Sequence, residues 1–243
     1  SGSHYIPASV LGGGRNDAGR VSFHSDGRGG RVFNFKSSLM AVWREDAGRR
    51  LSAIEKRRLQ YQREIAEATE AEAEKVRAAE GRYTAELILK ASARVDDHPY
   101  LTRKRVRPVG PMYEADAAVV NAVLADRGYR TAFGFQRIGY RSPEWHPMTG
   151  RVLVVPMWND GQLGTLEFID AVGHKSFLPK VPTAGAWWST RLIGESMTIG
   201  IAEGVATALS IDLVRGIPCV AAMSCGNMPR VAGWFARHWP GRQ

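Results

Sequence analysis

The stretch from Thr198 to Asn227 constrains the fold more than any other part of the sequence. It begins with small and β-branched residues, which Glu203 and a glycine interrupt before helical spacing starts at Val205. A second short apolar segment, 217–222, follows the helical run. This order predicts a strand, a crossover helix and a second strand, which would form a parallel, right-handed βαβ unit. Ligands of such units bind beyond the carboxyl ends of the strands, where Glu203 and the loop 224–227 are expected to lie.

The composition indicates a globular chain with a basic balance. The sequence has 243 residues, 44% of them hydrophobic, and a formal net charge of +9, which favours polyanionic partners such as nucleic acid without requiring one. No apolar run of about 18 residues could cross a membrane, and the N-terminus lacks a signal-peptide core, so a cytoplasmic protein without membrane contact is expected. Cys219 and Cys225 are too few for a disulfide framework or a zinc site, and we expect two reduced thiols.

The first two segments differ sharply in character. Residues 5–44 are rich in glycine, and the run VSFHSDGRGGRVFNF predicts a hairpin in a small β-rich element. Arginines and aromatic residues alternate there, which suits an accessory nucleic-acid contact, although packing in a small aromatic core is the expected role. Residues 45–95 are dominated by alanine, glutamate, arginine and lysine without proline, and predict one long charged helix. Because its apolar residues keep no strict heptad, a coiled coil is not expected.

Residues 96–194 open with a basic run and continue into strands. Four of the five residues 103–107 are basic, and Tyr100 and two prolines are expected to hold this run in an extended shape. Phosphate binding and a simple solvated surface both remain open for it. A short helix is predicted over 115–127, and RVLVVPMWNDGQLGTLEFIDAVGHKSFLP predicts two strands around a turn and a third short strand. Trp187 and its neighbour Trp188 are interpreted as packing residues rather than as base-stacking platforms.

Several segments, taken in order, resemble the catalytic core of bacterial-type primases, most closely the Toprim primases of conjugative plasmids, mobile elements and phages. The matching segments are HPYLTRKRV, FGFQRIGYR, RVLVVPMWNDGQLGTLEFI, GHKSFLP, RLIG, IAEGVATALSI and AAMSCGNM. The resemblance covers roughly residues 95–240. It implies an α+β fold, with the N-terminal subdomain of the primase core at 96–194 and a partial Toprim domain at 195–243.

The resemblance also implies an activity and a set of site residues. A primase synthesises a short RNA primer from ribonucleotides on a single-stranded DNA template, in some systems beside a replicative helicase. Glu203 matches the family glutamate that is proposed as general acid/base, and it is also the one candidate metal ligand, for Mg²⁺ or Mn²⁺. The candidate nucleic-acid or nucleotide contacts are Arg103, Lys104, Arg151, Lys175 and Lys180. Lysine and arginine suit phosphate contacts, and no sequence readout is expected from them.

One family feature does not appear in the sequence. The chain stops after the helix expected at 228–239, where the family's third strand and its Asp-x-Asp metal motif should begin. We therefore expect a shortened form or a natural fragment that is inactive alone, because hard cations need further carboxylate ligands. The alternative is a catalytically silent module that binds single-stranded DNA or a replication partner. A Toprim nuclease or a topoisomerase-like protein is a weaker alternative, because the segments from HPYL to RLIG point to primases.

Overall fold

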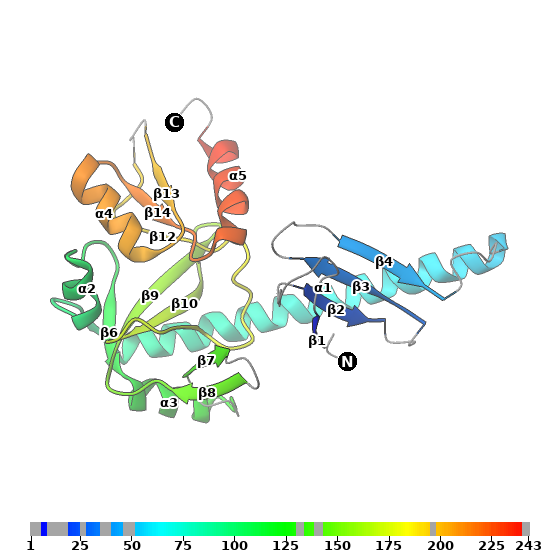
Figure 1. Ribbon diagram of the computed structural model, residues 1–243, viewed down its shortest axis with the longest axis horizontal. Helices are drawn as coiled ribbons and strands as arrows, with labels where there is room; N and C mark the ends of the chain where they lie inside the picture. The colour runs from blue at the N-terminus through cyan, green and yellow to red at the C-terminus, as the bar shows by residue number, and fades with distance from the viewer. Residues whose placement is uncertain are drawn as a thin grey trace. The chain divides into compact units, whose positions relative to one another are not determined.

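A computed structural model describes residues 6–8, 19–24, 28–34, 40–45, 52–129, 134–138, 143–194 and 198–239 (Figure 1). Helices and mainly antiparallel sheets occur together, which confirms the predicted α+β class. The chain divides into two compact units, Ser1–Ala66 and Glu67–Gln243. None of the helices within the described ranges combines the length and the apolar character needed to span a membrane.

The first unit contains a four-stranded antiparallel sheet in the order β1-β2-β3-β4. Its strands are β1 Ile6–Ala8, β2 Gly19–Phe23, β3 Gly29–Asn34 and β4 Met40–Arg44. The pairing of β2 with β3 confirms the predicted hairpin, whose expected turn residues Asp26 and Gly27 lie outside the described residues. Phe23 and Trp43 are 53% and 45% exposed, so these two rings do not form the small aromatic core that the sequence favoured.

Helix α1, Ala53–Lys90, confirms the long helix. It begins with a capping box, because the Ser52 amide donates to the Glu55 carboxylate at 2.9 Å and the Glu55 amide donates to the Ser52 hydroxyl at 3.2 Å. Only its C-terminal turns contain buried residues, and they begin at Gly81. The helix is therefore anchored by packing at one end, while solvated charge pairs such as Arg77–Glu70 line the middle.

The second unit is built on a five-stranded antiparallel sheet in the order β11-β10-β9-β6-β5. Its strands are β5 Ala93–Arg94, β6 Tyr113–Asp116, β9 Arg151–Asn159, β10 Gln162–Asp170 and β11 Lys175–Phe177. Side chains on one face, such as Val154 and Phe168, pack with the end of α1 and with α3, Ala117–Asp126. Those on the other face, such as Val155 and Ile169, pack with α2, Pro99–Lys104, and with the βαβ layer. Both faces of this sheet are therefore covered.

The βαβ layer confirms the strand–helix–strand unit that was predicted from the stretch Thr198 to Asn227. Strands β13, Gly200–Ala202, and β14, Cys219–Ala221, are parallel, and β12, Trp188–Ser189, extends the sheet on the other side of β14. Helix α4, Val205–Arg215, connects the two parallel strands, and α5, Met228–His238, follows a 3₁₀ turn at Cys225–Asn227. The two helices lie on opposite faces of this small sheet (Figure 1). A separate strand pair is formed by β7 Gly134–Ile138 and β8 Pro143–Pro147.

One local prediction in this unit was wrong. The basic run 103–107 is not extended throughout, because its first two residues, Arg103 and Lys104, lie in the last turn of helix α2. The His98 ring accepts a hydrogen bond from the Tyr100 amide at 3.3 Å and Pro99 occupies the first turn, so the residues before the run act as a helix start. The helix expected over 115–127 is confirmed as α3. It starts at Ala117, because 113–116 form strand β6 and Asp116 caps the amide of Ala118.

Candidate functional site

Glu203 lies directly after β13 and before α4, at the carboxyl end of the parallel strands. Its side chain is exposed, and it has no hydrogen-bond or ion-pair partner within the part of the chain that the structure describes. Gly204 caps α4 without any side-chain hydrogen bond to the first-turn amides. Those amide groups carry the positive end of the helix dipole and can receive an anion.

Lys175 is folded against this junction from a distant part of the sequence. It begins β11, where its backbone is in register with Ile169 of β10. Its ammonium lies 3.5 Å from the point where a Cβ on Gly204 would be. Lys175 and Glu203 were predicted separately. The structure places the Lys175 ammonium beside the residue that follows Glu203, so a cation and an exposed carboxylate lie at one helix start.

A buried glutamate holds Lys175 in this position. The Lys175 Nζ lies 3.4 Å from Glu167 Oε1, and the Glu167 side chain is 1% exposed against 36% for Lys175. Burial raises the pKa of Glu167, and the charge of Lys175 opposes that shift. The second oxygen, Oε2, is buried without a hydrogen-bond partner. Sequence reasoning missed Glu167, and the only signal was an acid between the apolar residues Leu166 and Phe168.

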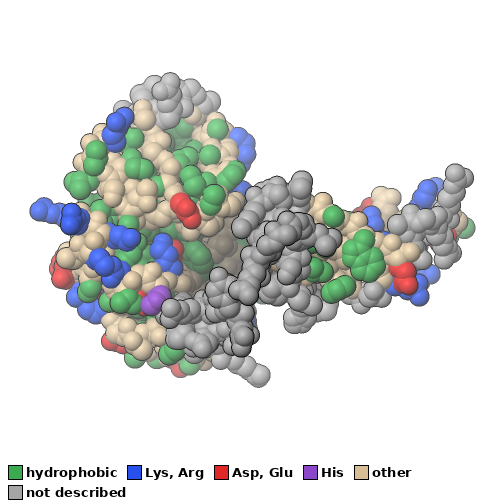
Figure 2. Space-filling model, viewed as in Figure 1, with side chains coloured by type: hydrophobic (Ala, Val, Ile, Leu, Met, Phe, Trp, Pro, Cys, Tyr) green, Lys and Arg blue, Asp and Glu red, His purple; other side chains and the backbone are tan. Residues whose placement is uncertain are grey.

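Helix α2 adds aromatic and basic side chains near the Glu167–Lys175 ion pair. Tyr100 is buried, and its pKa is raised by burial and further by the negative charge of Glu167. Arg103 donates to the Ala171 carbonyl at 2.8 Å, which ties α2 to the turn before Lys175. The cationic groups of Arg103 and Lys104 lie 5.8 Å and 6.0 Å from the centre of the Tyr100 ring. Figure 2 shows Lys and Arg side chains gathered on this face around α2 and α4.

Arg151, the first residue of β9, forms ion pairs with two acidic residues, Glu114 and Asp97. Its guanidinium donates to Glu114 Oε2 at 2.6 Å and to Asp97 Oδ1 at 3.1 Å. These hydrogen bonds raise the pKa of Arg151 further above its usual value. The guanidinium also donates to the Asp97 carbonyl at 2.7 Å, so it fastens the segment before α2 to the sheet. Its charge is thus largely neutralised by the protein itself.

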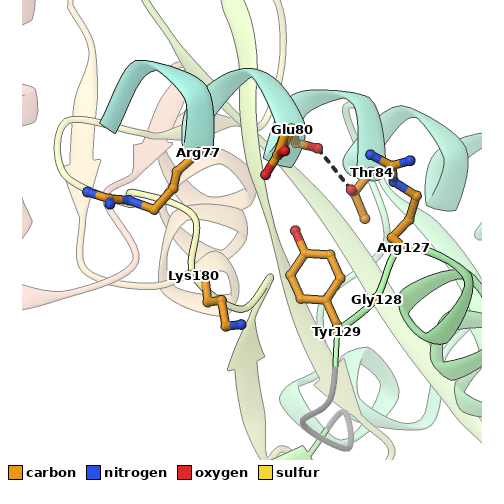
Figure 3. Close-up of a pocket in the computed structure, with 7 residues that line it drawn as sticks. All are labelled: Arg77, Glu80, Thr84, Arg127, Gly128, Tyr129 and Lys180. Carbon is orange, nitrogen blue, oxygen red and sulfur yellow. Dashed lines mark hydrogen bonds between the residues drawn. The ribbon is translucent and has the colours of Figure 1, made fainter. Parts of the chain in front are cut away.

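Lys180 lies in a different pocket, on the side of the sheet that α1 and α3 cover (Figure 3). This pocket has a volume of about 210 Å³. It is lined by Arg77, Glu80, Thr84, Arg127, Gly128, Tyr129 and Lys180. In Figure 3 the Tyr129 ring points towards helix α1, and the Lys180 side chain lies beside Tyr129. The structure does not bring Lys180 to Glu203.

Two further polar residues near the parallel strands, Asn227 and Cys219, are used by the fold. Asn227 precedes α5, but its side chain makes no cap to that helix. Its amide instead accepts from the Gly185 N–H at 2.7 Å and donates to the carbonyls of Ala186 and Ala222, each at 2.9 Å. Cys219 is buried, and burial raises the pKa of its thiol to about 11. Neither residue is therefore free to act on a ligand.

The described residues do not form a magnesium site on their own. No group of three or more His, Cys, Asp or Glu side chains comes together within the ranges that the structure describes. Asp212, the acid within α4, is buried and bound by Arg191, which lowers the pKa of Asp212. Glu203 can offer one carboxylate, and Mg²⁺ requires further oxygen ligands from a substrate or from other residues.

The structure therefore places Lys175 beside the helix start that follows Glu203, and it places Arg103 and Lys104 beside the Tyr100 ring, while Lys180 lines a separate pocket. Arg151 stays on the same sheet as a structural ion-pair residue. Comparisons of the chain with protein-family models, with curated proteins and with solved structures found no match.

Proposed function

We propose that this chain carries the nucleotide-binding and proton-transfer part of a Toprim primase core, which synthesises RNA primers on single-stranded DNA. One observation carries the proposal: Lys175 reaches the residue next to Glu203, with its ammonium 3.5 Å from the Cβ position of Gly204. A phosphate needs a cation and N–H donors, and a 3′-hydroxyl needs a proton acceptor. All three are present at this junction.

Each residue has a distinct role in this proposal. Lys175 and the first amides of α4 bind the phosphate of an incoming ribonucleotide. Glu203 accepts the proton of the attacking 3′-hydroxyl as the new bond to the α-phosphate forms and pyrophosphate leaves. Arg103 and Lys104 contact the backbone of the template or primer. No step is assigned to a metal, because the described residues do not complete a site for one.

The test of the proposal is primer synthesis by the complete gene product that contains this sequence. Ribonucleotide incorporation on single-stranded DNA is measured with Mg²⁺ or Mn²⁺ present, for the parent and for Glu203→Gln. Loss of the proton acceptor should lower the rate about a hundredfold or more. The matched control is Glu86→Gln, since Glu86 is an exposed glutamate on α1. Undiminished synthesis by Glu203→Gln would exclude the proposed role.

A binding module without catalysis is the second candidate. The observation in its favour is that no group of three or more His, Cys, Asp or Glu side chains, which could hold a metal ion, occurs within the described residues. Such a module would grip single-stranded DNA, or a replicative helicase, through the basic face around α2. Measurable DNA binding together with a complete lack of primer synthesis by the parent protein would favour this candidate over the enzyme.

A further inference from the structure

A tryptophan-lined cleft lies between the five-stranded sheet and the βαβ layer. Its volume is about 620 Å³, which is the size of a ligand pocket. Four of its lining residues are Trp158, Trp187, Trp234 and Trp239. All four are half-buried, so each indole is packed on one side and accessible on the other.

Ring contacts hold three of these tryptophans, Trp187, Trp234 and Trp239, in place, and together they form an aromatic wall of the cleft. The centroid of Trp234 lies 5.7 Å from that of Trp187 and 5.4 Å from that of Trp239. The Trp234 indole N–H also donates to Asp160 Oδ1 at 2.6 Å. A ligand that stacks on these rings would therefore meet a surface that is already in place, which lowers the cost of ordering it.

Two arginines line the same cleft, and one of them, Arg94, has no carboxylate partner among the described residues. The Arg94 guanidinium donates to the Gly110 carbonyl at 3.3 Å and lies 5.3 Å from the centre of the Tyr113 ring. Arg191 is fixed by Asp212. Both side chains are exposed, and an arginine has five N–H donors, so each keeps donors for a ligand. A cleft that joins an aromatic wall to fixed cations is complementary to a planar ring that carries a phosphate.

One indole in the wall has no hydrogen-bond partner. The N–H of Trp187 is buried and unpaired among the described residues. The neighbouring Trp188 donates its indole N–H to the Pro111 carbonyl at 2.8 Å, and Trp234 donates to Asp160. A buried donor without a partner is costly to a fold. Because this N–H has almost no accessible surface, a ligand in the cleft would contact the ring of Trp187 rather than its N–H.

We propose that this cleft binds a base of single-stranded nucleic acid by stacking, with the adjoining phosphate held by Arg94 and Arg191. An apolar peptide would use the tryptophans but would leave the Arg94 guanidinium without an anion, so this charge favours nucleic acid. The cleft shares its ligand class with the proposed function but includes neither Glu203 nor Lys175. The two proposals can therefore fail separately.

The experiment compares two probes of equal length, an oligothymidylate and an abasic oligodeoxynucleotide that keeps the phosphates. Tryptophan fluorescence and binding are measured for the parent chain, Trp158→Leu and Arg94→Gln. We expect thymidylate, and not the abasic probe, to quench the fluorescence. Trp158→Leu should weaken thymidylate binding about tenfold, as expected for the loss of one stacked base. Thermal unfolding shows whether each variant is folded, and Trp187→Phe gives a second variant that keeps a smaller ring in place of the indole.

Three outcomes would overturn the proposal. The first is equal binding of the two probes by the parent chain, which would mean that only charge is recognised. The second is unchanged thymidylate affinity in folded Trp158→Leu and Trp187→Phe. The third is self-association of the parent chain that Trp158→Leu abolishes, which would assign the cleft to a protein partner. Lys180→Gln is the matched control, because it removes one charge outside the cleft, and it should retain the thymidylate-dependent quenching.

Discussion

At the scale of single residues, the Lys175–Glu167 pair is asymmetric, and substitutions of its two members should have unequal effects. Glu167 is almost fully buried, whereas Lys175 keeps 36% of its side-chain surface exposed. Lys175→Met would leave a buried carboxylate without its counter-charge, which should lower the free energy of unfolding by about 3 kcal/mol at pH 7. Glu167→Gln leaves an ammonium that water can solvate, so its effect should stay within about 1 kcal/mol. Urea unfolding measures both, and equal losses would refute the asymmetry.

Glu167 should also give the protein a characteristic pH dependence. Because burial raises its pKa in the folded state, the folded protein binds this proton more tightly than the unfolded chain does. Stability from this group is therefore greatest below the usual glutamate pKa, and it falls as pH rises through the raised value. The expected result is a smaller free energy of unfolding at neutral than at mildly acidic pH, and a flatter profile for Glu167→Gln. Parallel profiles for the two proteins would contradict this explanation.

The sequence predicted the site residues only in part, and Glu167 shows why. Along β10, Glu167 alternates with Leu166 and Phe168, a pattern that indicates a solvent-facing acid beside a buried face. The second face is covered by residues far away in the sequence, from α2 and the βαβ layer. Glu203 could be predicted because a strand and a helix flank it directly. The tryptophan cleft could not be predicted, because its walls come from five separate segments.

At the scale of elements, the docking of α1 on the sheet depends on the glycine at position 81. A Cβ on Gly81 would lie 2.5 Å and 2.7 Å from the two methyl groups of Val181. Gly81→Ala should therefore destabilise the protein by about 1–3 kcal/mol, despite the better helix propensity of alanine. Gly233, inside α5, is the matched control, since its Cβ would meet only the end of Arg237, at 3.5 Å. Gly233→Ala should stabilise by about 0.5–1 kcal/mol.

Thermal unfolding distinguishes these outcomes. The double variant Gly81→Ala with Val181→Ala removes the clash and should recover part of the stability that the single variant loses, if the contact is the cause. An unchanged or higher melting temperature for Gly81→Ala alone would show that α1 does not dock tightly at this point.

Elements with local signals were predicted well, and those that depend on context were not. The hairpin of β9 and β10 and the βαβ unit are specified by turn residues and by apolar runs. Helix α2 was misread because proline normally breaks helices, whereas here Pro99 and His98 start one. Strand β6 was missed because it has only four residues and runs directly into α3.

At the scale of the whole molecule, the net charge of +9 says less than the places where its lysines and arginines lie. Arg151 and Arg191 are bound by carboxylates. Arg103 and Lys104 lie beside the Tyr100 ring on the face that also carries Lys175. Lys180 belongs to a pocket on the opposite side of the sheet. Binding of a polyanion should therefore depend on particular lysines rather than on total charge.

The most direct test of this account compares Lys175→Gln with Lys180→Gln in binding of single-stranded DNA by the chain, measured by fluorescence anisotropy over a range of salt concentrations. Each variant removes one lysine charge, so total charge is matched. The account predicts that Lys175→Gln weakens binding about tenfold and lowers the salt slope by about one, while Lys180→Gln changes affinity less than about twofold. Equal losses in the two variants, or no loss in Lys175→Gln, would contradict it.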